Sequence, residues 1–126
     1  MLSNKILSIN HISIHVKDVE LSKAFYKNIL LLKEKERPAF DFPGAWFEVG
    51  ENQELHLIGN LTQAVISGSR SNHFAFEVEN LKDWENHFNQ QKAIFRPAKK
   101  RSDGAWQIFI EDPDGYWIEL FSIFYE

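Results

Sequence analysis

The 126-residue chain contains no cysteine. It therefore has no disulfide framework and no thiolate that could serve in catalysis. The absence of cysteine also fits a reducing compartment, and we expect the protein to be cytoplasmic.

Long apolar runs and excess positive charge are also missing. No segment approaches 18 consecutive apolar residues, and residues 1–10 lack the apolar run of a signal peptide. The chain has 14 Lys and Arg against 18 Asp and Glu, which gives a net charge of −4. The basic run Lys99-Lys100-Arg101 is too short to outweigh that balance. We therefore expect no membrane and no nucleic acid among the partners.

The residues that are present suit one soluble folded domain. The hydrophobic share of 44% and the charged share of 25% are ordinary for a globular protein. The length is sufficient to bury a real core. Eleven Phe, four Trp and three Tyr could line a concave apolar pocket.

The chain repeats itself once. The segment His11–Val19 returns as His73–Leu81, 62 residues later, with the same order of histidine, alternating strand and polar residue. Two further echoes follow at similar offsets, Gly44-Ala45-Trp46 with Gly104-Ala105-Trp106, and Glu54–Ile58 with Trp117–Phe121. A single internal repeat with a possible metal ligand at both ends of each copy predicts a duplicated module around a shared site.

Each copy reads as a β-α-β-β-β module, so the sequence predicts an α+β fold. We place the modules at 1–62 and 72–126 within one domain, joined by a Ser- and Gly-containing linker over 63–71. The expected strands are 9–16, 31–40, 45–49, 55–58, 73–78, 93–98, 106–111 and 116–121.

Two helices are expected, each beginning at a polar capping residue. Asp18 is the predicted N-cap of a helix that runs to about Leu31, and Asn80 is the predicted N-cap of the second. Apolar residues recur at helical spacing in both. The predicted buried stripes are Leu21, Ala24, Phe25 and Ile29 in the first helix, and Leu81, Trp84 and Phe88 in the second.

Strand alternation predicts a shared metal site. Aliphatic residues on one face of each strand would pack under a helix, which turns His11 and His73 toward the opposite, concave face. The same alternation places His56 and Glu119 on that face in the last strand of each half. Three imidazoles and a carboxylate suit one divalent ion of Zn, Ni, Co, Mn or Fe. Glu119 could also act as general base.

Other polar residues are candidates for contacting a substrate. His15 lies on the His11 face, where a role in the pocket and a structural role are about equally plausible. Glu77 is its counterpart in the second half, and Arg101 could bind an anionic substrate, although a charged loop residue is often only solvated. A single histidine on a strand is commonly structural too, but four ligand-type residues at matching repeat positions favour a site.

The sequence resembles the vicinal oxygen chelate superfamily of glyoxalases, bleomycin resistance proteins and dioxygenases. The resemblance covers nearly the whole chain and rests on these motifs: Asn10–Val16, Ala24-Phe25-Tyr26, Leu55-His56-Leu57, His73–Phe76 and Glu111–Leu120. It implies two βαβββ modules that form a cup-shaped mixed sheet with helices outside. It also implies a homodimer.

Residue by residue, the resemblance implies metal roles for His11, His73 and Glu119. His56 matches a fourth ligand position that glyoxalase I uses, and Asn60 matches a position that contacts glutathione in bacterial glyoxalase I. His15 departs from the pattern, because glyoxalase I has a carboxylate-binding arginine there. The thiol partner, glutathione or another, is therefore left open.

These observations favour a metal-dependent, glyoxalase I-like lyase or isomerase. Its substrate would be a small oxygen-chelating molecule of the hemithioacetal type, reacting through an enediolate. Two alternatives keep the metal, namely an Fe(II) extradiol-type dioxygenase and a thiol transferase. A third is a metal-free binder of an aromatic or cationic drug, resembling a bleomycin resistance protein.

Overall fold

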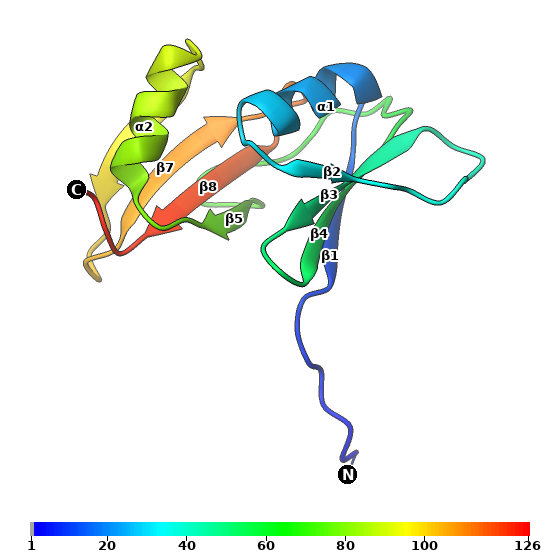
Figure 1. Cartoon of the computed structure of the whole chain (residues 1–126), viewed down its shortest axis with the longest axis horizontal. Coiled ribbons are helices and arrows are strands. Elements are labelled where there is room, and N and C mark those ends of the chain that lie inside the picture. The colour runs from blue at the N-terminus through cyan, green and yellow to red at the C-terminus, as the bar shows by residue number, and fades with distance from the viewer. Residues whose placement is uncertain (1) are drawn as a thin grey trace. The chain divides into compact units, whose positions relative to one another are not determined.

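The computed structural model describes residues 2–126, which form two compact units divided after Thr62 (Figure 1). The elements of the first unit are β1 (His11–His15), α1 (Val19–Asn28), β2 (Lys33–Lys35), β3 (Gly44–Val49) and β4 (Gln53–Ile58). Those of the second are β5 (Phe74–Glu77), α2 (Leu81–Gln90), β6 (Phe95–Lys100), β7 (Trp106–Glu111) and β8 (Trp117–Ser122).

Both units have the same topology. The strand orders are β1-β4-β3-β2 and β5-β8-β7-β6, so the first strand of each unit pairs with the last. That pairing is parallel, and the other pairings are antiparallel. The predicted α+β fold with two βαβββ modules is confirmed as two four-stranded mixed sheets with two helices.

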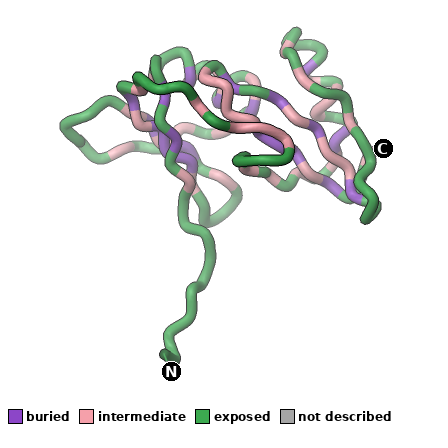
Figure 2. Tube along the Cα trace, turned by 180° about the vertical axis from the view of Figure 1, so that it is seen from behind, coloured by how far each residue is buried: buried purple, intermediate pink, exposed green. Residues whose placement is uncertain are grey.

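The core of each unit lies between its sheet and its helix. Leu55 and Leu57 of β4, and Ile118 and Leu120 of β8, are at most 1% exposed. Figure 2 shows buried residues at intervals along the chain in both units. These residues alternate with the candidate ligands of the same strands, as the sequence predicted. Neither ten-residue helix of the described chain is long and apolar enough to cross a membrane.

Strand register revises one of the sequence echoes. Trp46 pairs with His56, and Phe109 pairs with Glu119, so Trp46 and Phe109 are the equivalent residues of the two halves. Trp106 pairs instead with Ser122. The two Gly-Ala-Trp segments are therefore not structurally equivalent. Their identical residues pair with different positions of the neighbouring strand in the two halves.

The buried face of α1 also differs from the prediction. Asp18 caps the helix as expected, accepting a hydrogen bond from the Leu21 backbone N–H at 3.1 Å. The fully buried residues are Ser22 and Tyr26, whereas Leu21 is 58% exposed. Small Ser22 lets the helix approach the sheet, and the aromatic ring of Tyr26 fills the core beside Phe47 at a centroid distance of 6.1 Å.

Two strands occupy different ranges from those predicted. Strand β6 begins at Phe95, because the preceding residues finish the helix: Lys92 has a φ of +55° and the Ala93 N–H bonds to the Phe88 carbonyl. Strand β2 covers only three of the residues predicted between 31 and 40. Leu31, with a φ of +56°, still belongs to the helix ending.

The orientation of α1 predicts that two substitutions on this helix lower the free energy of unfolding by different amounts. Tyr26→Ala should destabilise the protein by about 3–5 kcal/mol, because it empties a fully buried aromatic site. The matched change Leu21→Ala, at an exposed position of the same helix, should cost roughly 0.5 kcal/mol or less. Urea unfolding of both variants measures the difference, and equal losses would contradict the observed helix orientation.

Candidate metal centre

Each half of the chain supplies one pair of the predicted ligands. In the first half the rings of His11 and His56 stack with centroids 4.3 Å apart. In the second half the His73 Nε2 atom lies 3.2 Å from Glu119 Oε1. Within neither half do the described residues gather three or more metal-binding side chains around one point. A complete centre therefore needs both pairs, and their convergence stays a prediction.

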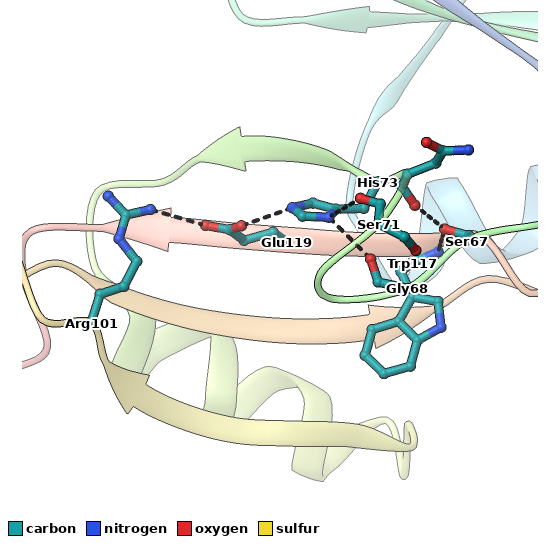
Figure 3. A network of polar contacts seen from close by, with 8 residues as sticks. Ser67, Gly68, Ser71, His73, Arg101, Trp117 and Glu119 are labelled. Atoms are coloured by element: carbon teal, nitrogen blue, oxygen red, sulfur yellow. Dashed lines mark hydrogen bonds and ion pairs between the residues drawn. The ribbon is translucent and has the colours of Figure 1, made fainter.

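The His73–Glu119 pair has a fixed orientation (Figure 3). His73 Nδ1 lies 3.1 Å from the carbonyl oxygens of both Gly68 and Ser71. Carbonyl oxygens only accept hydrogen bonds, so Nδ1 carries a proton and Nε2 is the nitrogen that faces the carboxylate. A neutral imidazole with this tautomer presents a lone pair to Glu119. The space between them then suits a proton or a metal ion.

Glu119 is only 5% exposed, and a buried carboxylate requires compensating partners. Besides His73, the guanidinium of Arg101 lies 3.8 Å from Glu119 Oε2. Arg101 is itself held by Asp103, at 2.5 Å between Nη2 and Oδ2. The sequence proposed Arg101 as a substrate contact, and the structure places it beside a predicted metal ligand.

The first pair is set in an aromatic stack. The His56 ring lies between Trp46, at 4.1 Å and an interplanar angle of 4°, and His11. His11 Nδ1 lies 2.8 Å from Asn10 Oδ1, which directs its Nε2 to a different partner. His56 Nε2 donates to Glu54 Oε1 at 2.8 Å. The two imidazoles are thus fixed in orientation before any metal binds.

Glu54 belongs to this cluster but was not among the predicted site residues. It forms an ion pair with Lys35, and it accepts the His56 hydrogen bond. The hydrogen bonds from His56 and then Lys35 lower the pKa of Glu54. The signal for it was present in the sequence, since Glu54 and His56 are two apart on one strand and share a face.

The other predicted substrate contacts lie at strand ends. His15 ends β1 and its Nε2 donates to the Gly59 carbonyl at 2.8 Å. Asn60 follows β4 with a φ of +71°, a conformation that asparagine tolerates well, and lines a cavity with Arg37. Glu77 ends β5 opposite Phe121. The structure therefore places Arg101 at a ligand pair and these three residues farther along the strands.

A model of the Glyoxalase/Bleomycin resistance protein/Dioxygenase superfamily matches residues 8–120. The chain belongs to this superfamily. The match includes both pairs of candidate ligands and most of the repeat. The family resemblance inferred from the motifs is confirmed.

Individual members of the superfamily are similar over most of their length. A lactoylglutathione lyase of Salmonella typhimurium is 32% identical over 120 residues, covering 87% of this chain and 88% of the relative. The metallothiol transferase FosB of Bacillus licheniformis is 29% identical over 125 residues, which cover 95% of this chain and 78% of the relative. A solved glyoxylase/bleomycin resistance protein/dioxygenase domain from Frankia aligns with a TM-score of 0.79 at 22% identity. The alignment covers 94% of this chain and 93% of the Frankia domain.

The Arg101–Asp103 contact predicts a pH-dependent contribution to stability. The Arg101 side chain, followed by the Ala105 backbone N–H, lowers the pKa of Asp103 to about 2. Because the folded pKa lies below the unfolded one, this contribution is present above about pH 4 and disappears as the pH falls through 2.

Asp103→Asn should therefore lower the unfolding temperature at pH 6, and the difference from the parent protein should shrink toward pH 2. Melting curves recorded at both pH values test this. Asp41→Asn, which removes the same charge from an exposed loop, is the control. A difference for Asp103→Asn that grows on acidification would contradict the assignment.

Proposed function

We propose that this chain is a metal-dependent lyase or isomerase of the lactoylglutathione lyase type. It would act on a small oxygen-chelating substrate, such as a hemithioacetal, through an enediolate. The observation that carries the proposal is the His73–Glu119 pair, whose carbonyl-bound Nδ1 leaves Nε2 facing a buried carboxylate at 3.2 Å. Metal-ligating histidines are commonly held by a second-shell acceptor in this way.

The donor set fits one divalent ion of Zn, Ni, Co, Mn or Fe. His11, His56 and His73 would contribute imidazole nitrogens, and Glu119 would contribute an oxygen. Imidazole and carboxylate groups are common ligands of these metals in proteins. The two pairs come from different halves, so the centre is proposed to form where two halves meet, within one chain or in a homodimer. When bound, the ion would supply Lewis acidity to the oxygens of the substrate.

The residues of the chain then have separate tasks. Glu119, proposed above as a ligand, would also take the proton from one substrate carbon and return it to the neighbouring carbon, since a buried carboxylate can act as general base and then as general acid. Arg101 lies 3.8 Å from its second oxygen and keeps the carboxylate oriented. Glu54 fixes the His56 ring.

Similar proteins support both the metal and the reaction class. Lactoylglutathione lyases of several bacteria are 32% identical to this chain over about 120 residues. A solved mutant of FosX from Listeria monocytogenes, of the same fold, is a complex with Mn(II) and dihydroxypropylphosphonic acid, and it aligns with a TM-score of 0.73 at 21% identity.

A second candidate is a metal-dependent thiol transferase that uses only His11, His73 and Glu119. One contact favours it. His56 Nε2 donates a hydrogen bond to Glu54, so this nitrogen must lose that bond and its proton before it can bind a metal. A three-ligand centre would leave the His56–Glu54 pair intact. The relative named metallothiol transferase FosB is consistent with this candidate.

Replacing His56 separates the two candidates. In the lyase, His56→Ala should lower both metal content and isomerisation of a methylglyoxal–thiol adduct by about tenfold or more, because a ligand is lost. Elemental analysis and a spectrophotometric assay with added Ni or Zn give the two readouts. His87→Ala, on α2, is the control. Unchanged metal content and turnover would exclude His56 as a ligand, and a metal-loaded parent protein without isomerisation activity would favour the thiol transferase.

Replacing Glu119 tests the proposed base. Glu119→Gln keeps an oxygen donor of the same shape but removes the basic carboxylate, so exchange of the substrate C–H proton should fall by about 10²–10⁴-fold. The metal affinity of Glu119→Gln should fall by a smaller factor than its rate of proton exchange. Proton exchange followed by NMR in D₂O, together with metal titration, measures both. Glu111→Gln on the neighbouring strand is the control, and retained exchange in Glu119→Gln would show that another group is the base.

A further inference from the structure

One hydroxyl group links the two strands that carry the second ligand pair. Ser67 Oγ accepts a hydrogen bond from the Trp117 backbone N–H at 2.9 Å and donates one to the Asn72 carbonyl at 2.6 Å (Figure 3). Asn72 directly precedes His73, and Trp117 begins β8 two residues before Glu119. The Ser67 hydroxyl therefore joins the backbone next to one member of the pair to the backbone near the other.

The first half has a direct backbone bond at the equivalent place. Asn10 and Asn72 precede the two repeated histidines, and Glu54 corresponds to Trp117, because β1 pairs with β4 in the same register as β5 with β8. There the Glu54 N–H donates straight to the Asn10 carbonyl at 3.1 Å. In the second half the Ser67 hydroxyl stands between the donor and the acceptor, so a side chain has entered the ladder.

The two histidines differ in a way that matches this insertion. His11 is the first residue of β1, whereas β5 begins at Phe74, so His73 lies just outside its strand. His73 is thus the last residue of the loop that precedes β5. That loop also supplies the partners of His73 Nδ1, the carbonyl oxygens described above. The loop, and not the strand alone, therefore determines where the His73 ring points.

Hydrogen bonds close the loop around His73 Nδ1. Besides the Ser67 hydroxyl, the Gly68 N–H donates to the Asn72 carbonyl, at 3.1 Å, and the Ser71 N–H donates to the Gly68 carbonyl at 3.4 Å. The carbonyls that accept from Nδ1 belong to Gly68 and Ser71. These two residues lie immediately inside the pair that the hydroxyl joins, so the closure determines where their carbonyls point.

We propose that Ser67 is a positioning residue for the His73–Glu119 pair. Its hydroxyl closes the loop, whose two carbonyls hold Nδ1 and thereby keep Nε2 facing the carboxylate. A hydroxyl group suits this task because it donates and accepts at once, whereas a methyl group in its place can do neither. The positioning of the ring stands on these hydrogen bonds alone, and its value for metal binding rests on the function proposed above.

Proton exchange with water tests the positioning on the full chain without metal. NMR of ¹⁵N-labelled protein detects the His73 Nδ1–H, which is identified by its loss in His73→Gln. In Ser67→Ala this proton should exchange at least about tenfold faster, because the loop opens more often. Ser67→Thr keeps the hydroxyl, and Ser69→Ala removes a neighbouring one that takes no part in these bonds. Both should change the rate by less than about twofold.

Three results would overturn the role of Ser67. The first is an unchanged rate in Ser67→Ala, or no such signal in the parent protein. The second is an equal acceleration in Ser69→Ala, which would assign the effect to the loop in general. The third is an equal acceleration in Ser67→Thr, which would show that the hydroxyl is not responsible.

Exchange of a backbone amide separates positioning from a general loss of stability. The Leu120 N–H belongs to β8, which has a paired strand on both sides, so it exchanges when the sheet opens. Ser67→Ala should accelerate the His73 Nδ1–H by a larger factor than the Leu120 N–H, and equal factors would overturn the positioning role. If Ser67→Ala does not fold, Ser67→Cys, with its weaker S–H donor and sulfur acceptor, takes its place.

A metal titration measures the consequence for the candidate centre. Co(II) is added to the parent protein and to Ser67→Ala and followed by visible absorption. The affinity should be about tenfold lower in the variant, since groups that orient metal ligands typically contribute about 10–100-fold. Faster proton exchange with unchanged cobalt affinity would uphold the positioning of His73 and contradict the metal role of the pair. Unchanged exchange would overturn the role of Ser67 whatever the metal result.

Discussion

The parallel pairing of the first and last strand in each half positions the candidate chemistry. Strand β1 runs beside β4, and β5 beside β8, with the same register in both halves. Side chains alternate along a strand, so this register brings His11 to His56 and His73 to Glu119 while the aliphatic residues between them pack under the helices. A slip of one residue would exchange the two faces and bury the candidate ligands in the core.

In the second pair, the contacts that stabilise a buried carboxylate belong to the candidate metal centre. Glu119 is almost fully buried, and a carboxylate there would be costly without His73 and Arg101 beside it. The same partners determine its chemistry, because His73 presents Nε2 and Arg101 restrains the second oxygen. The carbonyl oxygens that hold His73 Nδ1 come from the loop just before β5. That loop therefore contributes to the site although it carries no ligand.

Periodicity was sufficient to predict the fold and the alternation of the candidate ligands with core residues, because both depend on the strand period and on the repeat. Periodicity was not sufficient where side-chain packing or contacts determine which residue is buried and which residues correspond. The core side of α1 follows Ser22 and Tyr26 rather than the more hydrophobic Leu21, since a small residue allows close approach to the sheet. The equivalence of Trp46 and Phe109 emerges only from strand register. The role of Glu54 depends on its contact with His56, which alternation allows but does not specify.

The two halves share a scaffold but have diverged in charge. In the first, Glu54 engages both Lys35 and His56, so the cation and the imidazole are satisfied within the half. In the second, Trp117 takes the place of Glu54, and Arg96 keeps its charge on the face of Glu119. One substitution at a single ladder position thus separates a half in which the cation pairs with a carboxylate from a half in which it stacks on an aromatic ring. A duplicated fold can divide its tasks in this way, because the ladder fixes where each side chain lies and leaves its chemistry open to change.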